Sequence, residues 1–128
     1  MAKLLTSKAI ISVIGLGYVG LPLAEAFSKD FQVIGFDIDG EKVRKLTENG
    51  TNKKLVFTDS PEEIAKADFI IICVPTPLTK SKEPDLSAVQ KAAKLTGQNM
   101  KKGSVVILES TVYPGVTEEI LVPILERV

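Results

Sequence analysis

The sequence of 128 residues contains no histidine, no tryptophan and a single cysteine, Cys73. Without histidine, a histidine general base, a Ser-His-Asp triad and any histidine-containing metal site are excluded within this chain. One cysteine excludes an internal disulfide and a multi-cysteine zinc site, so we expect no metal, and it suits a reducing, cytoplasmic compartment. Cys73 lies in the apolar run 69–74, which predicts a buried strand cysteine.

An excess of charge and long apolar runs are also missing. Sixteen basic and sixteen acidic residues cancel, and no basic stripe is interleaved with aromatics, so neither nucleic acid nor an anionic membrane surface is the expected partner. No apolar run approaches the ~18 residues of a membrane span, and residues 1–8 lack the apolar stretch of a signal peptide. We therefore expect one soluble, cytoplasmic domain over residues 1–128.

The most informative stretch joins an apolar run, 9–14, to a helical pattern through three glycines. These are Gly15, Gly17 and Gly20, which read G-x-G-x-x-G. Gly15 would permit a tight turn, Gly17 would leave room for a pyrophosphate, and Gly20 would let the helix pack close to a sheet. The N-terminus of that helix would point its N–H groups and positive dipole end at the phosphates. The stretch therefore predicts a dinucleotide-binding turn.

A carboxylate follows at the spacing that such a turn requires. A second predicted strand, 31–37, ends at Asp37, about 20 residues after Gly15. A carboxylate there accepts hydrogen bonds from the ribose hydroxyls of NAD and repels the extra phosphate of NADP, so the expected cofactor is NAD. Lys42, early in the next helix, could reach the ribose or a phosphate. The alternatives are an unrelated βα turn with Asp37 as a solvated strand end, and Lys42 as a solvated surface charge.

Apolar runs and helical patterns alternate along the rest of the chain. The predicted strands are 9–14, 31–37, 55–58, 69–74 and 104–109, and the predicted helices are 18–29, 40–48, 61–68, 85–101 and one from Thr117 onward. We predict that Ser60 caps the third helix with Glu63 completing a capping box, and that Pro123 kinks the last helix. The pattern predicts an α/β fold, a Rossmann-type doubly wound parallel sheet of about five strands in the order 3-2-1-4-5, truncated before a sixth strand.

Polar residues also follow the fourth and fifth predicted strands, as Pro75-Thr76-Pro77 and Glu109-Ser110-Thr111. Taken alone, the first could merely stop a strand and the second could be a helix-capping turn. Because the carboxyl ends of parallel strands meet at one edge of a sheet, both should converge with the glycine turn on a single cleft. The two prolines would fix the backbone there, and Thr76 would offer a hydroxyl in a rigid frame.

Taken together, these motifs resemble the N-terminal NAD-binding domain of the UDP-glucose/GDP-mannose dehydrogenase family. The matching segments, in family order, are G-L-G-Y-V-G-L-P-L-A (15–24), F-D-I-D (36–39), V-P-T-P (74–77), E-P-D-L-S (83–87) and E-S-T-V-Y-P-G (109–115). The last segment is most similar to the branch that acts on UDP-N-acetylhexosamines. The link at 49–54 is shorter than the family's usual segment.

The resemblance implies NAD-dependent oxidation of a UDP-sugar, of the UDP-N-acetylhexosamine or UDP-glucose type, from C6 alcohol to carboxylate, as in polysaccharide biosynthesis. It also implies a set of cofactor-binding residues, namely Gly15, Gly17, Tyr18, Val19, Gly20, Asp37, Lys42, Pro75, Thr76, Ser110 and Thr111. Thr111 is the candidate catalytic residue, whose hydroxyl would position a water or the substrate hydroxyl. The family's thiol nucleophile and its partners belong to later segments, and Cys73 is not that cysteine, so these residues alone should be inactive.

Two other functions stay open. The chain could be a non-catalytic dinucleotide-binding module that pairs with another copy through its edge strand, 104–109, as a homo-oligomer. It could also be a methyltransferase or a nucleotide sensor on the same fold. That function predicts binding of S-adenosylmethionine or a mononucleotide in preference to NAD.

Overall fold

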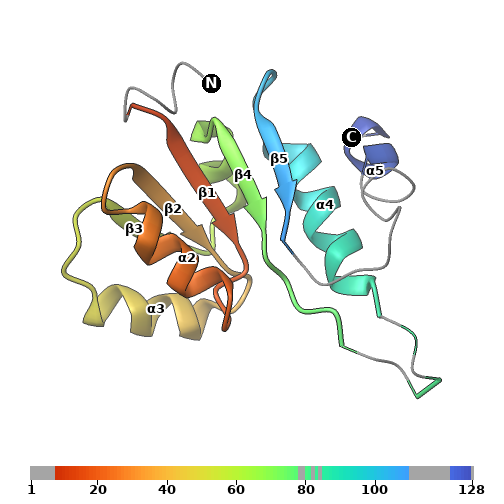
Figure 1. Ribbon diagram of the computed structural model, residues 1–128, viewed down its shortest axis with the longest axis horizontal. Coiled ribbons are helices and arrows are strands. Elements are labelled where there is room, and N and C mark those ends of the chain that lie inside the picture. The colour runs from red at the N-terminus through yellow and green to blue at the C-terminus, as the bar shows by residue number, and fades with distance from the viewer. Residues whose placement is uncertain (1–7, 78–79, 82, 84, 110–121, 128) are drawn as a thin grey trace.

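The computed structural model contains a five-stranded sheet in the order β3-β2-β1-β4-β5 (Figure 1). It describes residues 8–77, 80, 81, 83, 85–109 and 122–127. The strands are β1 (Ile10–Ile14), β2 (Gln32–Phe36), β3 (Leu55–Thr58), β4 (Phe69–Ile72) and β5 (Val105–Leu108). The helices are α2 (Gly20–Phe27), α3 (Gly40–Asn49), the 3-10 helix η1 (Pro61–Lys66), α4 (Ser87–Asn99) and α5 (Val122–Arg127). The predicted fold class and strand order are confirmed.

Strand β1 lies at the centre of the sheet and pairs in parallel with β2 on one side and β4 on the other. Its last residue, Ile14, stands level with Phe36 of β2 and Ile72 of β4. The three strands therefore end together. Because ligands of open α/β sheets bind at the carboxyl ends of the strands, this register brings the polar strand ends to one place.

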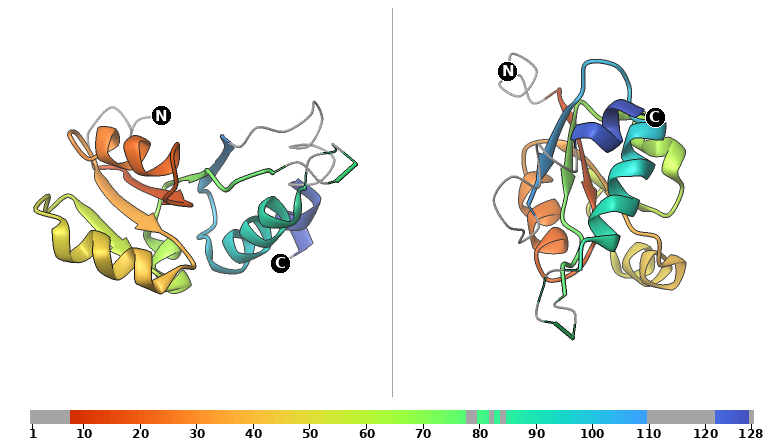
Figure 2. Two further views of the ribbon diagram at one scale, coloured as in Figure 1. Left: turned by 90° about the horizontal axis from the view of Figure 1, so that it is seen from below. Right: turned by 90° about the vertical axis from the view of Figure 1, so that its right-hand side faces the viewer.

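The sheet is covered by two apolar layers, and Figure 2 shows α2 and α4 on opposite sides of it. One layer contains Ile11 and Val13 of β1 together with side chains of α2 and α3. The other contains Ile14 of β1 together with side chains of η1, α4 and α5. Successive residues of β1 thus face opposite layers, which explains why its apolar run is nearly continuous.

The third helix differs from its prediction, and the predicted capping box is wrong. The Ser60 hydroxyl donates to the Glu62 carboxylate instead of capping the helix. The helix is a 3-10 helix, in which the Glu63 N–H donates to the Ser60 carbonyl at 3.2 Å. Only residues 59–68 separate β3 from β4, and the Asp68 N–H is already bound to the Ile10 carbonyl of the sheet. The short link favours a tight helix.

The last helix is described from Val122 onward, and its predicted start at Thr117 lies outside the described residues. Pro123 lies in the described part of α5, and the residues before Val122 that would decide the predicted kink lie outside the described residues. The side chains of Ile124 and Leu125 pack against the layer that contains η1 and α4. This part of the helix has the apolar face that the sequence predicts.

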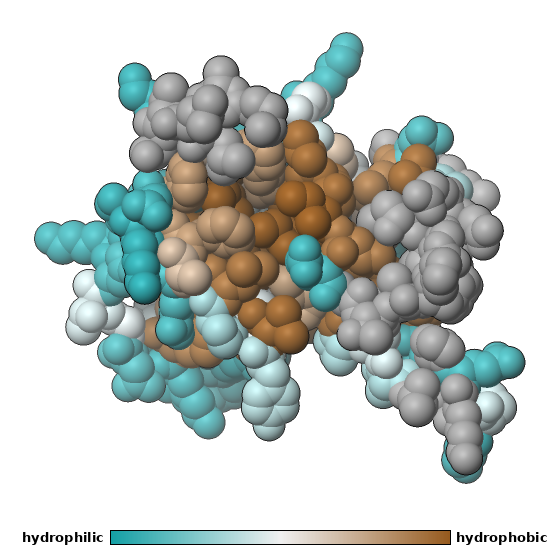
Figure 3. All heavy atoms as spheres, in the orientation of Figure 1, coloured by the Kyte–Doolittle hydropathy of each residue, from teal (hydrophilic) through white to brown (hydrophobic). Residues whose placement is uncertain are grey.

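Edge strand β5 exposes apolar side chains on the face of the sheet that carries α2. Val105 and Ile107 are 48% and 38% exposed, and they stand in register with Phe69 and Ile71, which belong to the α2 layer. Figure 3 shows apolar surface gathered over the middle of this face. Within the described ranges, no helix combines the length and the apolar character that crossing a membrane would take.

Candidate functional site

Three strand ends surround the turn that follows β1. The N–H of Gly15 donates to the Phe36 carbonyl at 2.8 Å, and the N–H of Cys73 donates to the Ile14 carbonyl at 2.7 Å. The turn is therefore bonded to the end of β2 on one side and lies beside the end of β4 on the other. In Figure 1 the arrowheads of β1, β2 and β4 point toward this same end of the sheet, which we call the carboxyl end.

Two glycines of the turn have no room for a side chain. Gly15 has a φ of +98°, and a Cβ there would lie 2.9 Å from the Cys73 carbonyl oxygen. A Cβ on Gly20 would lie 1.7 Å from the Gly15 carbonyl oxygen. The turn predicted at Gly15 is confirmed. At Gly20 the nearest atoms belong to the turn, and the Cβ of Cys73, directly after β4, would lie 3.2 Å away, so Gly20 lets α2 lie close both to the turn and to the end of the sheet.

The surface above the start of α2 is open. A Cβ on Gly17 would have no atom within 4 Å, and the side chains of Tyr18 and Val19 are exposed. Val19 is the N-cap of α2 and offers no side-chain acceptor to the amides of the first turn. The Leu21 N–H already donates to the Gly17 carbonyl at 3.1 Å and Pro22 has no N–H, so an anion here would be attracted by the positive end of the helix dipole and by the open backbone at Gly17. The arrangement fits the pyrophosphate of a dinucleotide.

Asp37 is held at the end of β2 by three hydrogen bonds. Its Oδ2 accepts from the Leu16 N–H at 2.9 Å and from Lys42 Nζ at 3.2 Å, and its Oδ1 accepts from the Asp39 N–H at 2.9 Å. Its side chain is only 11% exposed. Asp37 is therefore not a solvated strand end, and the ammonium of Lys42 is not an isolated surface charge.

The pKa of Asp37 is lowered although burial alone would raise it. The backbone N–H groups of Asp39 and Leu16 and the ammonium of Lys42 stabilise the charged form and outweigh the loss of hydration. Asp37 is thus an ionised acceptor at neutral pH. A carboxylate offers about four acceptor positions, so Asp37 has room for a ligand hydroxyl besides these three donors.

Asp39 belongs to this arrangement, although the sequence analysis did not single it out. Its carboxylate caps α3 by accepting from the N–H groups of Glu41 and Lys42 at 3.1 and 3.2 Å. The signal was present in the sequence, because aspartate is a preferred N-cap residue and the predicted helix begins at Gly40. The bond from its N–H to Asp37 is an Asx-turn, which an aspartate two residues earlier in the sequence also favours.

The segment after β4 completes the described part of the carboxyl end. Pro75 is exposed and Thr76 is half-buried, and the Pro77 carbonyl accepts from the Asp85 N–H at 2.7 Å, which ties this segment to the start of α4. Ser110 and Thr111 lie outside the described residues. Their neighbour Glu109 donates its N–H to the Ile72 carbonyl at 2.9 Å.

Cys73 lies directly beneath the glycine turn and is buried. Burial, together with the nearby carboxylate of Glu109, raises the pKa of its thiol to about 11. The thiol is therefore protonated at neutral pH, whereas a reactive cysteine needs a lowered pKa. The predicted burial of Cys73 is confirmed, but the residue lies directly after β4 rather than within it.

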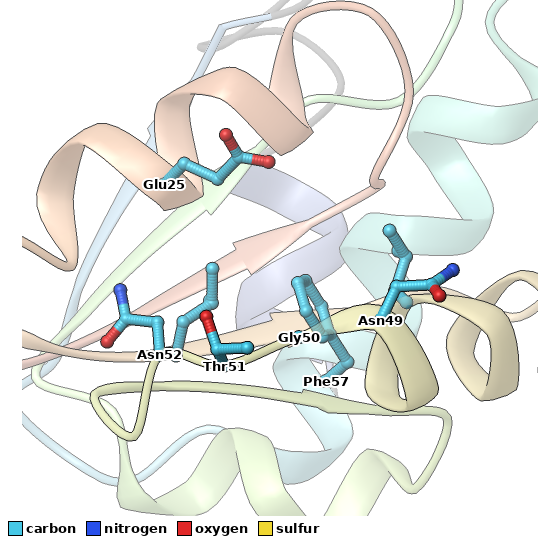
Figure 4. Close-up of a pocket in the computed structure, with 8 residues that line it drawn as sticks. Glu25, Asn49, Gly50, Thr51, Asn52 and Phe57 are labelled. Carbon is cyan, nitrogen blue, oxygen red and sulfur yellow. The ribbon is translucent and has the colours of Figure 1, made fainter.

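A separate hollow of about 390 Å³ lies between α2, the end of α3 and β3 (Figure 4). Its lining consists of Glu25, Leu46, Asn49, Gly50, Thr51, Asn52, Leu55 and Phe57. Asn52 already binds the Ser28 hydroxyl through Nδ2 and the Lys54 N–H through Oδ1. None of the predicted cofactor-binding residues lines this hollow, so it is distinct from the carboxyl end.

Comparison with known proteins decides the family. Residues 9–128 match the NAD binding domain of the UDP-glucose/GDP-mannose dehydrogenase family. The chain belongs to this family. The resemblance noted from the sequence motifs is confirmed, and so is NAD as the cofactor of this type of domain.

Individual relatives agree with this assignment. Protein CapL of Staphylococcus aureus and the UDP-N-acetyl-D-glucosamine 6-dehydrogenase of Salmonella typhi are each 45% identical, over 91% of this chain and 30% of their own length. The solved structure of a UDP-D-ManNAc dehydrogenase from Pyrococcus horikoshii superposes with a TM-score of 0.83 at 36% identity, over 92% of this chain and 32% of that chain. The chain thus spans about a third of the length of these relatives.

Proposed function

We propose that this chain binds NAD at the carboxyl end of its sheet, as the cofactor-binding part of a nucleotide-sugar 6-dehydrogenase. The observation that carries the proposal is the hydrogen bond between the Leu16 N–H and the Asp37 carboxylate. This bond joins the glycine turn, which fits a pyrophosphate, to the ionised carboxylate of Asp37, which fits a ribose. The bond links both halves of the proposed dinucleotide site directly, and we propose residues 1–128 as a single domain.

Each predicted site residue receives a role in this proposal. The pyrophosphate lies over Gly17 at the start of α2, between the backbones of Gly15 and Gly20 and beside Tyr18 and Val19. The adenosine ribose donates to Asp37, with Lys42 at its edge. Pro75 and Thr76 would line the cleft after β4, while Ser110 and Thr111, which lie outside the described residues, are assigned to the nicotinamide by the family resemblance alone. Bound NAD supplies the hydride acceptor, and Thr111 positions a water or the substrate hydroxyl.

The proposed overall reaction oxidises the C6 alcohol of a UDP-N-acetylhexosamine, or of a UDP-glucose-type sugar, to a carboxylate. Two NAD are reduced and one water is consumed for each sugar. Catalysis needs a nucleophile that these residues lack, because the buried thiol of Cys73 has a raised pKa. We therefore expect the 128 residues to bind NAD without turnover. The free buried thiol suits a cytoplasmic location.

Calorimetric titration tests this proposal directly. NAD should bind the chain more tightly than NADP, and Asp37→Ala should weaken NAD binding and reduce the preference. Incubation with NAD and UDP-N-acetylglucosamine should give no NADH absorbance. A chain that binds S-adenosylmethionine in preference to NAD would overturn the proposed cofactor, and clear NADH formation would overturn the expected inactivity.

One observation favours a second function, a non-catalytic module that self-associates as a homo-oligomer. Val105 and Ile107 are exposed on edge strand β5, and an apolar edge can pair with another copy. Sedimentation velocity should then show a concentration-dependent dimer that Ile107→Lys abolishes. A monomer at every concentration would rule this function out.

A further inference from the structure

Asp39 is bonded to both members of the Asp37–Lys42 pair. Its N–H donates to Asp37 Oδ1 at 2.9 Å, and its own Oδ1 accepts from the Lys42 N–H at 3.2 Å. The side chain of Lys42 then returns to Asp37, with Nζ 3.2 Å from Oδ2. The three residues form a closed ring of hydrogen bonds between the end of β2 and the start of α3.

The ring determines where the ammonium of Lys42 lies. Lys42 is in the first turn of α3, and that turn is held by the Asp39 carboxylate, which also accepts from the Glu41 N–H at 3.1 Å. The side chain of Lys42 is 40% exposed and its stem is flexible. If the first turn of α3 loosened, the ammonium could leave Asp37 and swing toward solvent.

The position of this ammonium matters for the choice between NAD and NADP. An ammonium paired with Asp37 is not available to the extra phosphate of NADP, whereas a released ammonium attracts a phosphate. A carboxylate held in place at the ribose also rejects that phosphate better than a mobile one. Resting on the NAD site proposed above, we infer that Asp39 is a positioning residue that sets the preference of this site for NAD over NADP.

Variants at Asp39 test this role, because its side chain is exposed and its removal opens no cavity. The readout is the ratio of the dissociation constants of NADP and NAD, measured by calorimetry on the whole chain. Asp39→Ala removes an N-cap and should lower this ratio about five- to tenfold, since a cap is worth about 1 kcal/mol and 1.4 kcal/mol is tenfold. Asp39→Asn can still cap, so it should restore the ratio to within about twofold of the parent value.

Two further variants separate positioning from a general loss of stability. Asn52→Ala removes a side-chain acceptor from the Lys54 N–H, a bond of 2.9 Å in the loop beyond the other end of α3. It should lower the melting temperature without changing the ratio. Asp39→Leu also removes the cap, because leucine caps as poorly as alanine, so it gives the same reading if the alanine variant does not fold.

The inference is overturned if Asp39→Ala and Asp39→Leu keep the parent ratio while only the melting temperature falls, as for Asn52→Ala. It is also overturned if Asp39→Asn loses the preference as fully as Asp39→Ala, because the charge of Asp39 rather than its capping would then be responsible. If the parent chain binds neither cofactor, the proposed NAD site fails and this inference fails with it. A parent chain that prefers NAD, with variants that keep the preference, refutes the role of Asp39 alone.

Discussion

Two carboxylates at opposite ends of the same sheet have similar partners. Asp37 accepts from the N–H groups of Leu16 and Asp39 and pairs with Lys42. Asp68 accepts from the Ile10 N–H at 3.0 Å and pairs with Lys101 at 2.7 Å. Both side chains are 11% exposed. Chemistry alone does not distinguish them.

Their places in the sheet distinguish them. Asp37 follows β2 and contacts an open glycine turn, at the end where ligands of parallel sheets bind. Asp68 precedes β4, and its backbone is bonded to Ile10 and Val105 at the starts of β1 and β5. We propose that the same combination of carboxylate, amide and lysine serves ligand binding at the carboxyl end and strand alignment at the amino end.

The largest expected effect concerns the glycine turn. In Gly20→Ala the new Cβ would meet the Gly15 carbonyl oxygen, so the turn must open. NAD affinity should fall about 100-fold or more, equivalent to roughly 3 kcal/mol, when measured by calorimetry. Gly103 gives a matched control at the amino end, since its φ is +89° but no atom crowds its Cβ position. Gly103→Ala should cost about 1–2 kcal/mol of folding free energy from backbone strain and leave NAD affinity unchanged.

The next prediction compares the two carboxylates, Asp37 and Asp68. Asp37→Asn should weaken NAD binding about tenfold or more, because hydrogen bonds to a charged group are worth about 1.5–3 kcal/mol. Asp68→Asn should lower the free energy of unfolding by a similar amount, about 2 kcal/mol, with no change in NAD affinity. Urea unfolding and calorimetry on both variants measure these effects. If Asp37→Asn and Asp68→Asn lost NAD affinity equally, the proposed difference between the carboxyl end and the amino end of the sheet would be refuted.

A smaller effect follows from the lowered pKa of Asp37. Its folded-state pKa lies below the ordinary value of 3.8, so its ionised form stabilises the fold above that value. This contribution is lost as the pH falls from 3.8 through the lowered folded-state pKa. The difference in unfolding free energy between the parent chain and Asp37→Asn should therefore be constant above about pH 5 and shrink below about pH 4. A difference that grows on acidification would contradict the pKa direction.

The smallest expected signal is the reaction of Cys73 with iodoacetamide. A buried thiol with a pKa of about 11 should be almost unreactive in the folded chain at pH 8. Unfolding in urea should restore the rate of an ordinary cysteine, as followed by mass spectrometry. Rapid alkylation of the folded chain would show that the Cys73 thiol, beneath the glycine turn, is accessible to solvent.

The strands and their order could be predicted because the apolar runs are short and separated by clear turn residues. The run 69–74 is continuous because β4 is covered on both faces. Gly15 and Asp37 were recognisable because their spacing follows from the geometry of a dinucleotide turn. Local patterns sufficed for these strands and for the glycine turn, but not for the capping box at Ser60.

The remaining features depend on contacts between segments distant in sequence. The bond from Leu16 to Asp37 spans 21 positions, and no pattern in either segment records it. The helix after Ser60 follows a 3-10 path because β3 and β4 leave it little chain. The hollow beside Phe57 arises where α2, α3 and β3 meet, which only the assembled fold reveals.

The central claim is that NAD binds at the carboxyl end of the sheet and not at its amino end. NMR titration of the isotope-labelled chain with NAD tests it most directly, because each backbone amide reports separately. We predict that the amide signals of 15–20 and 37–42 shift, while those of 67–69 and 101–104 stay in place. Shifts confined to the amino end, or to the hollow at 49–57, would contradict the account.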